Sequence, residues 1–177
     1  MNYMEMNFCR RCGSQLTAQS PGVFTCANSH TLYSSAAPTA GIFFVTDDNH
    51  ALLSVRGIEP FKGMLDSFGG FVDEQETAEE ALARELQEEL GLTPDQYDTP
   101  IYLSTETSIY PYQGEDRTVF GVFFWSRLKP GVTPTPADDV AAIEKVPLAA
   151  IDFTKLDNAD VKKALKKLQE LRSEKES

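Results

Sequence analysis

Residues 70–92 read GFVDEQETAEEALARELQEELGL, and they carry the clearest secondary-structure pattern in the chain. Their second part, residues 77–90, is rich in Ala, Glu and Leu, which favour helices. Thr77 and Glu80 have the spacing of a capping box, and Gly91 is a typical helix stop. The pattern predicts a helix that begins after Thr77 and ends before Gly91.

One face of this predicted helix is strongly acidic. Glu85, Glu88 and Glu89 lie three and four residues apart, so they span an arc of roughly 100°. Like charges this close repel one another, and a bound divalent cation relieves that repulsion. Carboxylate oxygens are ligands that Mg²⁺ or Mn²⁺ prefers. The face therefore predicts a metal and phosphate site, and the alternative is a solvated face with an Arg84–Glu88 ion pair.

The order of residues across the whole segment favours the metal site. It runs Gly70, five residues, Glu76, seven residues, Arg84-Glu85-Leu86, one residue, Glu88-Glu89, one residue, Gly91-Leu92. This order resembles the signature of the Nudix hydrolase superfamily at every specified position. The resemblance implies an α/β fold, namely an α/β/α sandwich with a mixed sheet.

The same resemblance implies the ligands of Mg²⁺ (or Mn²⁺). Glu88 and Glu89 are expected to bind the metal, and the Gly70 carbonyl is a further candidate ligand. Glu85 is expected to be either another ligand or the base that activates water. Phe68 stands where such proteins commonly have Pro, which alters the loop before the helix without removing a ligand.

Two other residues of the segment are expected to support catalysis. By the resemblance, Arg84 orients Glu85 by charge-assisted hydrogen bonds, and Glu76 supports that arrangement. A further acidic residue from a later loop often completes such sites. The candidates in this chain are Glu115, Asp116, Asp138 and Asp139.

The N-terminal part of the chain carries all three cysteines. Cys9 and Cys12 form a C-x2-C pair, and Cys26 and His30 follow as C-x3-H, which is a ligand set suited to tetrahedral Zn²⁺. The module resembles a zinc ribbon, and together with the Nudix signature it resembles NADH pyrophosphatases and other zinc-ribbon Nudix proteins. Ribbons usually have C-x2-C in both pairs, so Ser29 stands in place of a cysteine.

His30 can therefore complete the site only if its turn opens by one residue, and the alternative is a degenerate, metal-free ribbon. A closed four-ligand zinc site is structural. We expect two domains, a zinc-ribbon-like module over residues 1–36 and a Nudix domain over residues 37–177, with Pro38 near the boundary.

Apolar, β-branched and aromatic runs predict the other elements. The expected strands are 41–45 and 51–55, which form a hairpin, followed by 101–109 and 118–128. The expected loops are 57–70, 110–117 and 129–139, and an amphipathic terminal helix is expected over 158–172.

Length and charge restrict the function. The 177 residues allow one domain with a core and a small appendage, and the net charge of −11 opposes nonspecific binding to nucleic acid or an anionic membrane. The chain shows no membrane-spanning run and no signal-peptide pattern, so a cytoplasmic location is expected. A small nucleotide-type molecule is the expected substrate, and the sequence allows a homodimer.

The function expected from these features is cleavage of a phosphoanhydride bond in a dinucleotide or nucleotide sugar, such as NADH or ADP-ribose. The downstream motif of NADH pyrophosphatases is absent, since residues 104–111 read STETSIYP. Tyr110 or Tyr112 stacks on a base or, alternatively, packs within the protein. Two other functions remain open: a catalytically silent Nudix-like nucleotide-binding or sensor module, and an RNA 5′-end pyrophosphohydrolase.

Overall fold

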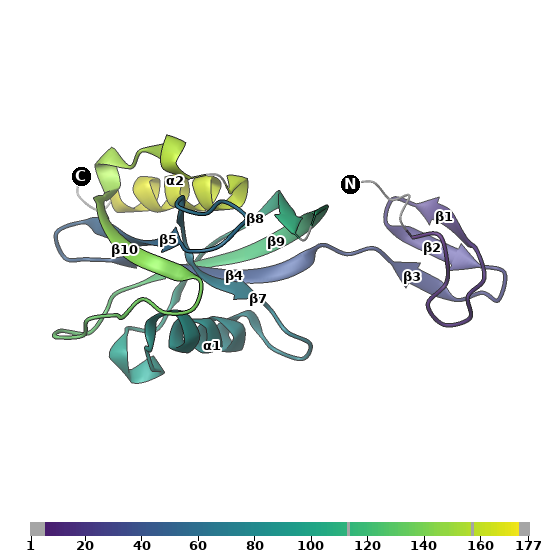
Figure 1. Cartoon of the computed structure of the whole chain (residues 1–177), viewed down its shortest axis with the longest axis horizontal. Coiled ribbons are helices and arrows are strands. Elements are labelled where there is room, and N and C mark those ends of the chain that lie inside the picture. Colours follow the sequence, from purple (N-terminus) through teal and green to yellow (C-terminus); the bar gives the residue numbers. More distant parts are fainter. Residues whose placement is uncertain (1–5, 113, 157, 174–177) are drawn as a thin grey trace.

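The computed structural model describes residues 6–112, 114–156 and 158–173. A small antiparallel sheet with the order β1-β2-β3 comes first, and a larger seven-stranded sheet follows it (Figure 1). The three strands of the small sheet are β1 (Leu16–Ser20), β2 (Val23–Cys26) and β3 (Thr31–Tyr33).

The larger sheet has the order β10-β5-β4-β9-β8, with β6 paired to β5 and β7 paired to β4. It is mixed, because β4 and β9 run parallel at its centre while the other pairs are antiparallel. Its strands are β4 (Ala37–Val45), β5 (His50–Arg56), β6 (Leu65–Asp66), β7 (Phe68–Phe71), β8 (Ile101–Tyr112), β9 (Glu115–Ser126) and β10 (Val140–Pro147).

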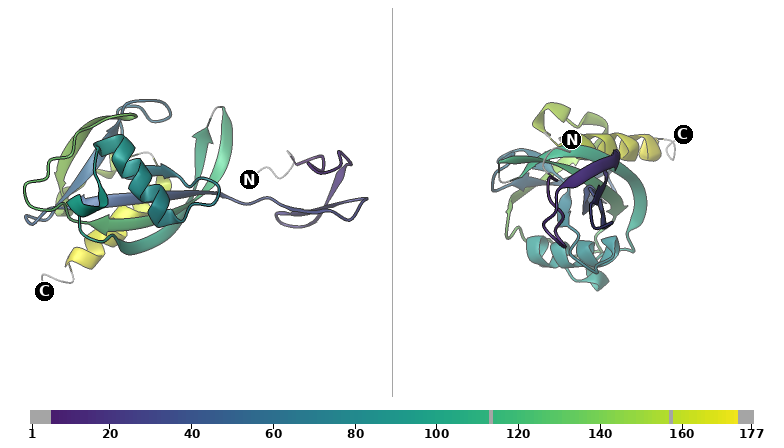
Figure 2. Two further views of the ribbon diagram at one scale, coloured as in Figure 1. Left: turned by 90° about the horizontal axis from the view of Figure 1, so that it is seen from below. Right: turned by 90° about the vertical axis from the view of Figure 1, so that its right-hand side faces the viewer.

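Two helices cover opposite faces of this sheet, as Figures 1 and 2 show. Helix α1 spans Ala78–Leu90 and α2 spans Ala159–Ser173. Strand β4 is buried on both faces: Phe43 belongs to the core cluster that contains the α2 residue Leu165, whereas Phe44 belongs to the cluster that contains the α1 residue Leu86. The expected α/β/α sandwich with a mixed sheet is therefore confirmed. Three short 3₁₀ turns, Pro94–Gln96, Leu148–Ala150 and Phe153–Lys155, complete the secondary structure of the described residues.

The ends of α1 match the prediction. The Glu80 amide donates to Thr77 Oγ1 at 3.2 Å, and the Thr77 amide donates to the Glu80 carboxylate at 2.8 Å, which is a complete capping box. Gly91 has a φ of 65°, the left-handed conformation that ends a helix. The predicted hairpin also forms, with Phe44 paired to Leu52.

Two predicted loops were wrong. Residues 110–117 were expected to be a loop, but β8 continues to Tyr112 and β9 begins at Glu115, while residue 113 lies outside the described residues. The strands extend because the rings of Tyr110 and Tyr112 both pack against Phe71. The expected loop 57–70 contains β6 and most of β7, whose pairing partners are supplied by β5 and β4.

Strand β10 was not predicted, because it is only partly apolar and its pairing with β5 is long-range. Within the described residues, no helix is long and apolar enough to cross a membrane. The small sheet lies before residue 37 and the large sheet begins at Ala37.

Candidate active site and candidate zinc centre

A pocket of about 310 Å³ lies where several segments of the larger sheet and both helices meet. Three of the residues expected to bind metal, Gly70, Glu85 and Glu89, line it, and so does Asp139 from the segment before β10. Glu88, which shares their helix face, is more exposed and is not among the lining residues.

Arg84 connects the helix to the loop that precedes it. Its Nε donates to Glu76 Oε1 at 2.9 Å, and its Nη2 donates to Glu76 Oε2 and to the Phe71 carbonyl, each at 3.0 Å. Its Nη1 donates to Glu85 Oε1 at 2.8 Å and lies 3.4 Å from Glu88. Hydrogen bonds from Arg84 hold the pKa of Glu76 at about 2, below its usual range. The guanidinium therefore holds Glu85 and Glu76 in fixed positions, as the sequence resemblance implies.

Glycine is required where the loop passes Glu85. A Cβ atom on Gly70 would lie 2.4 Å from Glu85 Oε1, which is far inside contact distance. The preceding Gly69 has a φ of 122°, and a Cβ there would lie 2.1 Å from the Ala40 carbonyl oxygen. Gly69 thus lets β7 lie close to β4, and Gly70 leaves room for the Glu85 carboxylate of α1.

Glu89 is the buried member of the acidic face, with 4% of its surface exposed. Its carboxylate accepts a hydrogen bond from the Gly69 amide at 2.9 Å. Burial, with the nearby Asp139 and Glu85 carboxylates, raises the pKa of Glu89 to about 9 despite the lowering effect of the Gly69 amide. Burial also raises the pKa of Glu85.

These carboxyl groups fit a divalent cation. The nearby Asp139 and Glu85 carboxyl groups raise the pKa of Glu89, because carboxylates this close repel one another and a proton on Glu89 compensates that repulsion. A cation offers the same compensation and uses the oxygen ligands that Mg²⁺ and Mn²⁺ prefer. Of the four candidate loop acids, Asp138 and Asp139 line the pocket, whereas Glu115 and Asp116 lie at the start of β9 and are not among its lining residues.

Two further charged residues of the pocket were missed by the sequence analysis. Arg56 donates from Nη1 to Asp66 at 3.2 Å and from Nη2 to the Tyr110 hydroxyl at 3.2 Å, and its Nη2 lies 4.0 Å from Asp139. Burial raises the pKa of Asp66 to about 6, although Arg56 opposes the shift. No periodic pattern marks either residue, since each ends a short strand and they meet only through sheet pairing.

Aromatic rings form the wall near the mouth of the pocket. Tyr110 and Tyr112 line it together with Phe71, and the Tyr110 and Tyr112 rings stack with centroids 6.5 Å apart. Tyr110 also packs edge-on against Phe61. Both tyrosines therefore pack against other aromatic side chains of the protein, as one of the two sequence-based interpretations predicts.

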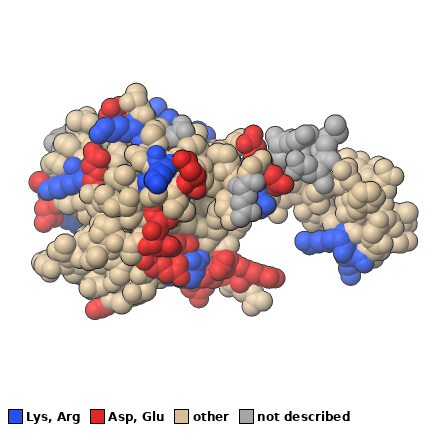
Figure 3. Space-filling model, viewed as in Figure 1, with Lys and Arg blue, Asp and Glu red and all other residues tan. Residues whose placement is uncertain are grey.

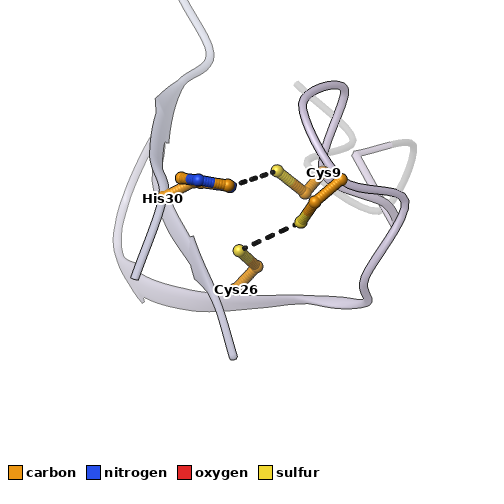
Figure 4. A group of neighbouring side chains, drawn as sticks. Cys9, Cys26 and His30 are labelled. Carbon is orange, nitrogen blue, oxygen red and sulfur yellow. Dashed lines mark hydrogen bonds between the residues drawn. The ribbon is translucent and has the colours of Figure 1, made fainter. Parts of the chain in front are cut away.

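The predicted zinc ligands come together in the N-terminal sheet module. The sulfur atoms of Cys9, Cys12 and Cys26 and one His30 ring nitrogen all lie within 4.8 Å of one another. Cys9 Sγ is 3.5 Å from His30 Nδ1 (Figure 4). Cys12 Sγ is 3.7 Å from Cys26 Sγ. In the turn before His30, Ser29 adopts a left-handed φ of 59° and its amide donates to the Cys26 carbonyl at 2.9 Å.

Hydrogen bonding within this module favours a thiolate. Hydrogen bonds from the Ser14 side chain and backbone lower the pKa of Cys12 to about 5, whereas burial raises the pKa of Cys9. Cysteine binds metal as the thiolate, so the environment of Cys12 fits a cation at this position.

Charge is distributed unevenly over the molecule. In the view of Figure 3, acidic side chains gather over α1 and the segment that leads into it. The basic side chains of the N-terminal module are Arg10 and Arg11. A phosphate group that approaches the acidic face therefore needs a cation between itself and the carboxylates.

Comparison with known proteins identifies a family and several proteins that this chain resembles. The family model described as "NUDIX domain" matches residues 36–168. An ADP-ribose pyrophosphatase of Methanocaldococcus jannaschii is 50% identical over 50 residues, and the matched segment covers 28% of this chain and 30% of that protein.

Solved structures share the fold. A NUDIX hydrolase from Nitrosomonas europaea superposes with a TM-score of 0.65 at 19% identity, covering 96% of this chain and 93% of its own. The NUDIX domain of Shewanella oneidensis NrtR, solved with ADP ribose, gives a TM-score of 0.59 at 21% identity, covering 78% of this chain and 90% of its own.

Proposed function

The chain belongs to the NUDIX domain family, and on that basis we propose that it is a hydrolase that cleaves the diphosphate linkage of a nucleoside diphosphate joined to another moiety, with ADP-ribose as the leading substrate. The observation that carries this proposal is the convergence of the Glu85, Glu89 and Asp139 carboxyl groups in one pocket beside the Gly70 loop. Such a group of carboxylates has no structural benefit by itself, because its members repel one another.

In this proposal Glu85, Glu88, Glu89 and the Gly70 carbonyl hold Mg²⁺ or Mn²⁺, and Asp139 is added from the later segment. A cation held by these residues would neutralise the diphosphate and make its phosphorus a better electrophile. Glu88 remains accessible at the rim, where its side chain is 49% exposed. The buried Glu89 and the half-buried Glu85 lie deeper in the site.

The residues of the chain position and activate water. Arg84 fixes Glu85 through the 2.8 Å bond, and Glu76 in turn fixes Arg84. Burial raises the pKa of Glu85, which makes its carboxylate a stronger base. As a water oxygen bonds to one phosphorus, the bond from that phosphorus to the bridging oxygen breaks. Glu85 takes the proton of the water, and the second phosphate departs with the bridging oxygen.

The choice of ADP-ribose is supported by the sequence match to the archaeal ADP-ribose pyrophosphatase, which extends over 30% of that relative. NADH is less well supported, because residues 104–111 lack the motif that NADH pyrophosphatases carry. For ADP-ribose the balanced reaction consumes one water and yields AMP and ribose 5-phosphate.

We also propose that residues 1–36 form a separate zinc-ribbon domain before the Nudix domain of residues 37–177. The four ligands Cys9, Cys12, Cys26 and His30 would form a closed tetrahedral site, which leaves no open position for catalysis. The module has a small apolar cluster of Cys9, Cys26 and Leu32, with Met6 and Leu16 packed against it. A core this small needs a metal to stay folded.

A substrate panel tests the proposed reaction. Purified protein with Mg²⁺ is incubated with ADP-ribose, NADH, diadenosine polyphosphates, nucleoside triphosphates and 5′-triphosphate RNA, and products are separated by chromatography. We expect AMP and ribose 5-phosphate from ADP-ribose, and no product when the metal is chelated. Turnover of RNA alone would replace the proposed substrate class, and no turnover of any compound would favour the silent binding module.

A further inference from the structure

One part of the pocket wall differs in chemistry from the part that Glu85 and Glu89 form. Asn158, Asp160 and Val161, at the beginning of α2, line the pocket together with Asp66. None of these residues belongs to α1 or to the segment between β7 and α1. These residues thus form a second wall of the pocket, and the proposed reaction assigns no role to it.

The side chain of Asn158 is fixed by one partner and lacks a second. Its Nδ2 donates to Asp66 Oδ2 at 3.0 Å. Because a carboxylate oxygen accepts hydrogen bonds, the amide nitrogen of Asn158 faces Asp66 and its Oδ1 points away. Its Oδ1 is buried, and no donor within the described part of the chain reaches it. A buried carbonyl oxygen without a donor costs free energy, which makes it a position where a ligand donor is favoured.

A helix cap does not account for this side chain. An asparagine before a helix ordinarily accepts a hydrogen bond from a first-turn amide through its side-chain oxygen. Here the Val161 amide donates instead to Asp160 Oδ1 at 3.0 Å. Asn158 is therefore oriented toward Asp66 and the pocket.

Two carboxyl groups share this wall with Asn158. Asp66 and Asp160 are both buried, with 6% and 5% of their surfaces exposed. Arg56 offsets the charge of Asp66, because its Nη1 donates to Asp66 Oδ2 at 3.2 Å. Both carboxyl groups already accept hydrogen bonds, Asp66 also from the Ser67 amide and Asp160 from the Val161 amide. Among the described residues of this wall, Asn158 Oδ1 is the acceptor left for a ligand, and it favours a group that carries an N–H or O–H donor.

From this arrangement we infer that Asn158, supported by Asp66 and Asp160, forms a recognition subsite for a donor-bearing, non-phosphate moiety of the substrate. The inference rests on the proposed function and deepens it. The diphosphate lies at the part of the wall that Glu85 and Glu89 form, and a sugar hydroxyl or a base amine donates to Asn158 Oδ1 at the second wall. Asn158 is then a determinant of substrate specificity.

Two analogues of ADP-ribose test the subsite and distinguish the two sources of the donor. ADP ethyl ester lacks the terminal ribose, and the purine analogue of ADP-ribose lacks the exocyclic amine of adenine. For wild type, at least one analogue should show a kcat/KM about tenfold or more below that of ADP-ribose, because a buried hydrogen bond is lost. Whichever analogue is discriminated identifies the moiety.

In Asn158→Ala this discrimination should fall to within about threefold, through a higher KM for ADP-ribose and a kcat within about threefold of wild type. Lys162→Ala, also in the first turn of α2 but absent from the pocket lining, is the matched control and should keep the wild-type selectivity. Circular dichroism verifies that both variants are folded.

Unchanged selectivity in a folded Asn158→Ala would overturn the subsite and leave the proposed reaction standing. If that variant does not fold, the wild-type comparison still decides: equal kcat/KM for all three compounds would refute the inference. Failure of wild type to hydrolyse any of them would instead refute the proposed function, and the subsite would fall with it.

Discussion

At the scale of single residues, Arg84 determines the geometry of the candidate site. It makes two hydrogen bonds to Glu76, one to the Phe71 carbonyl and one to Glu85. Burial and neighbouring carboxyl groups keep the pKa of Glu89 high. Hydrogen bonds to Glu76 and Glu85 raise the pKa of Arg84 and keep its guanidinium charged. The candidate site therefore combines a hydrogen-bonded ion pair with carboxyl groups whose mutual repulsion a bound cation would relieve.

The Glu76–Arg84 pair predicts a pH dependence of stability. The pKa of Glu76 is about 2 in the folded chain, against 4.5 ordinarily. A lowered pKa stabilises the folded state above pH 4.5, and this contribution is lost as the pH falls toward 2. Glu76→Gln should therefore reduce the free energy of unfolding near pH 6, and its difference from wild type should vanish near pH 2.

Urea titrations at several pH values measure this difference. Glu74→Gln, in an exposed position of the same loop, is the control and should change stability little at any pH. A Glu76→Gln deficit that stays constant from pH 6 to pH 2 would contradict the assigned ion pair.

Periodicity explains which residues could be predicted from the sequence. Glu85, Glu88 and Glu89 share a helix face, so spacing alone places them together, and the wider signature adds Arg84 and Glu76. Arg56 and Asp66 follow no such pattern, because β-sheet pairing and burial bring them to the pocket. Asp139 could only be named among four loop acids, since its approach to Glu89 depends on the path of the chain into β10.

At the scale of elements, α1 is fixed by its caps and by its buried leucines. Leu82, Leu86 and Leu90 are buried against the sheet, which leaves the acidic residues toward the pocket and solvent. This helix was predictable because cap signals, composition and periodicity agree. The 110–117 segment was not, since its polar residues favour a loop while tertiary packing of two tyrosine rings favours strands.

The capping box of α1 makes a measurable contribution. Thr77→Ala removes the hydrogen bond to the Glu80 amide and should lower the free energy of unfolding by about 1 kcal/mol. Chemical denaturation followed by the fluorescence of Trp125, the single tryptophan of the chain, measures the change. Thr133→Ala, at an exposed loop position, should stay within about 0.5 kcal/mol of wild type. Equal losses in both variants would argue against the cap.

At the scale of the whole molecule, the chain combines two sheets that differ in how they are stabilised. The larger sheet has two apolar clusters, one against each helix, whereas the small sheet has a single small cluster that includes two of the candidate zinc ligands. The sequence predicted both the α/β/α fold and the Cys and His cluster. It could not supply β10, which depends on long-range pairing, or the left-handed backbone conformation of Ser29, which is a local feature of the folded turn.

The proposed zinc ribbon predicts how much zinc the protein binds. Protein purified without chelators should contain about one zinc per chain, and His30→Ala should lose most of it because a three-ligand site holds zinc less tightly. His50→Ala, which changes the other histidine of the chain, should retain the metal. Elemental analysis provides the measurement, and zinc-free wild type or zinc-replete His30→Ala would contradict the site.

The central claim, that the acidic face of α1 performs metal-dependent hydrolysis, is tested most directly by Glu89→Gln. We expect its kcat/KM for ADP-ribose in Mg²⁺ to fall about a thousandfold, because the substitution removes a charged oxygen ligand. Glu79→Gln, an exposed glutamate in the first turn of the same helix, should keep the wild-type rate. A folded Glu89→Gln variant with a rate within threefold of wild type would contradict the account.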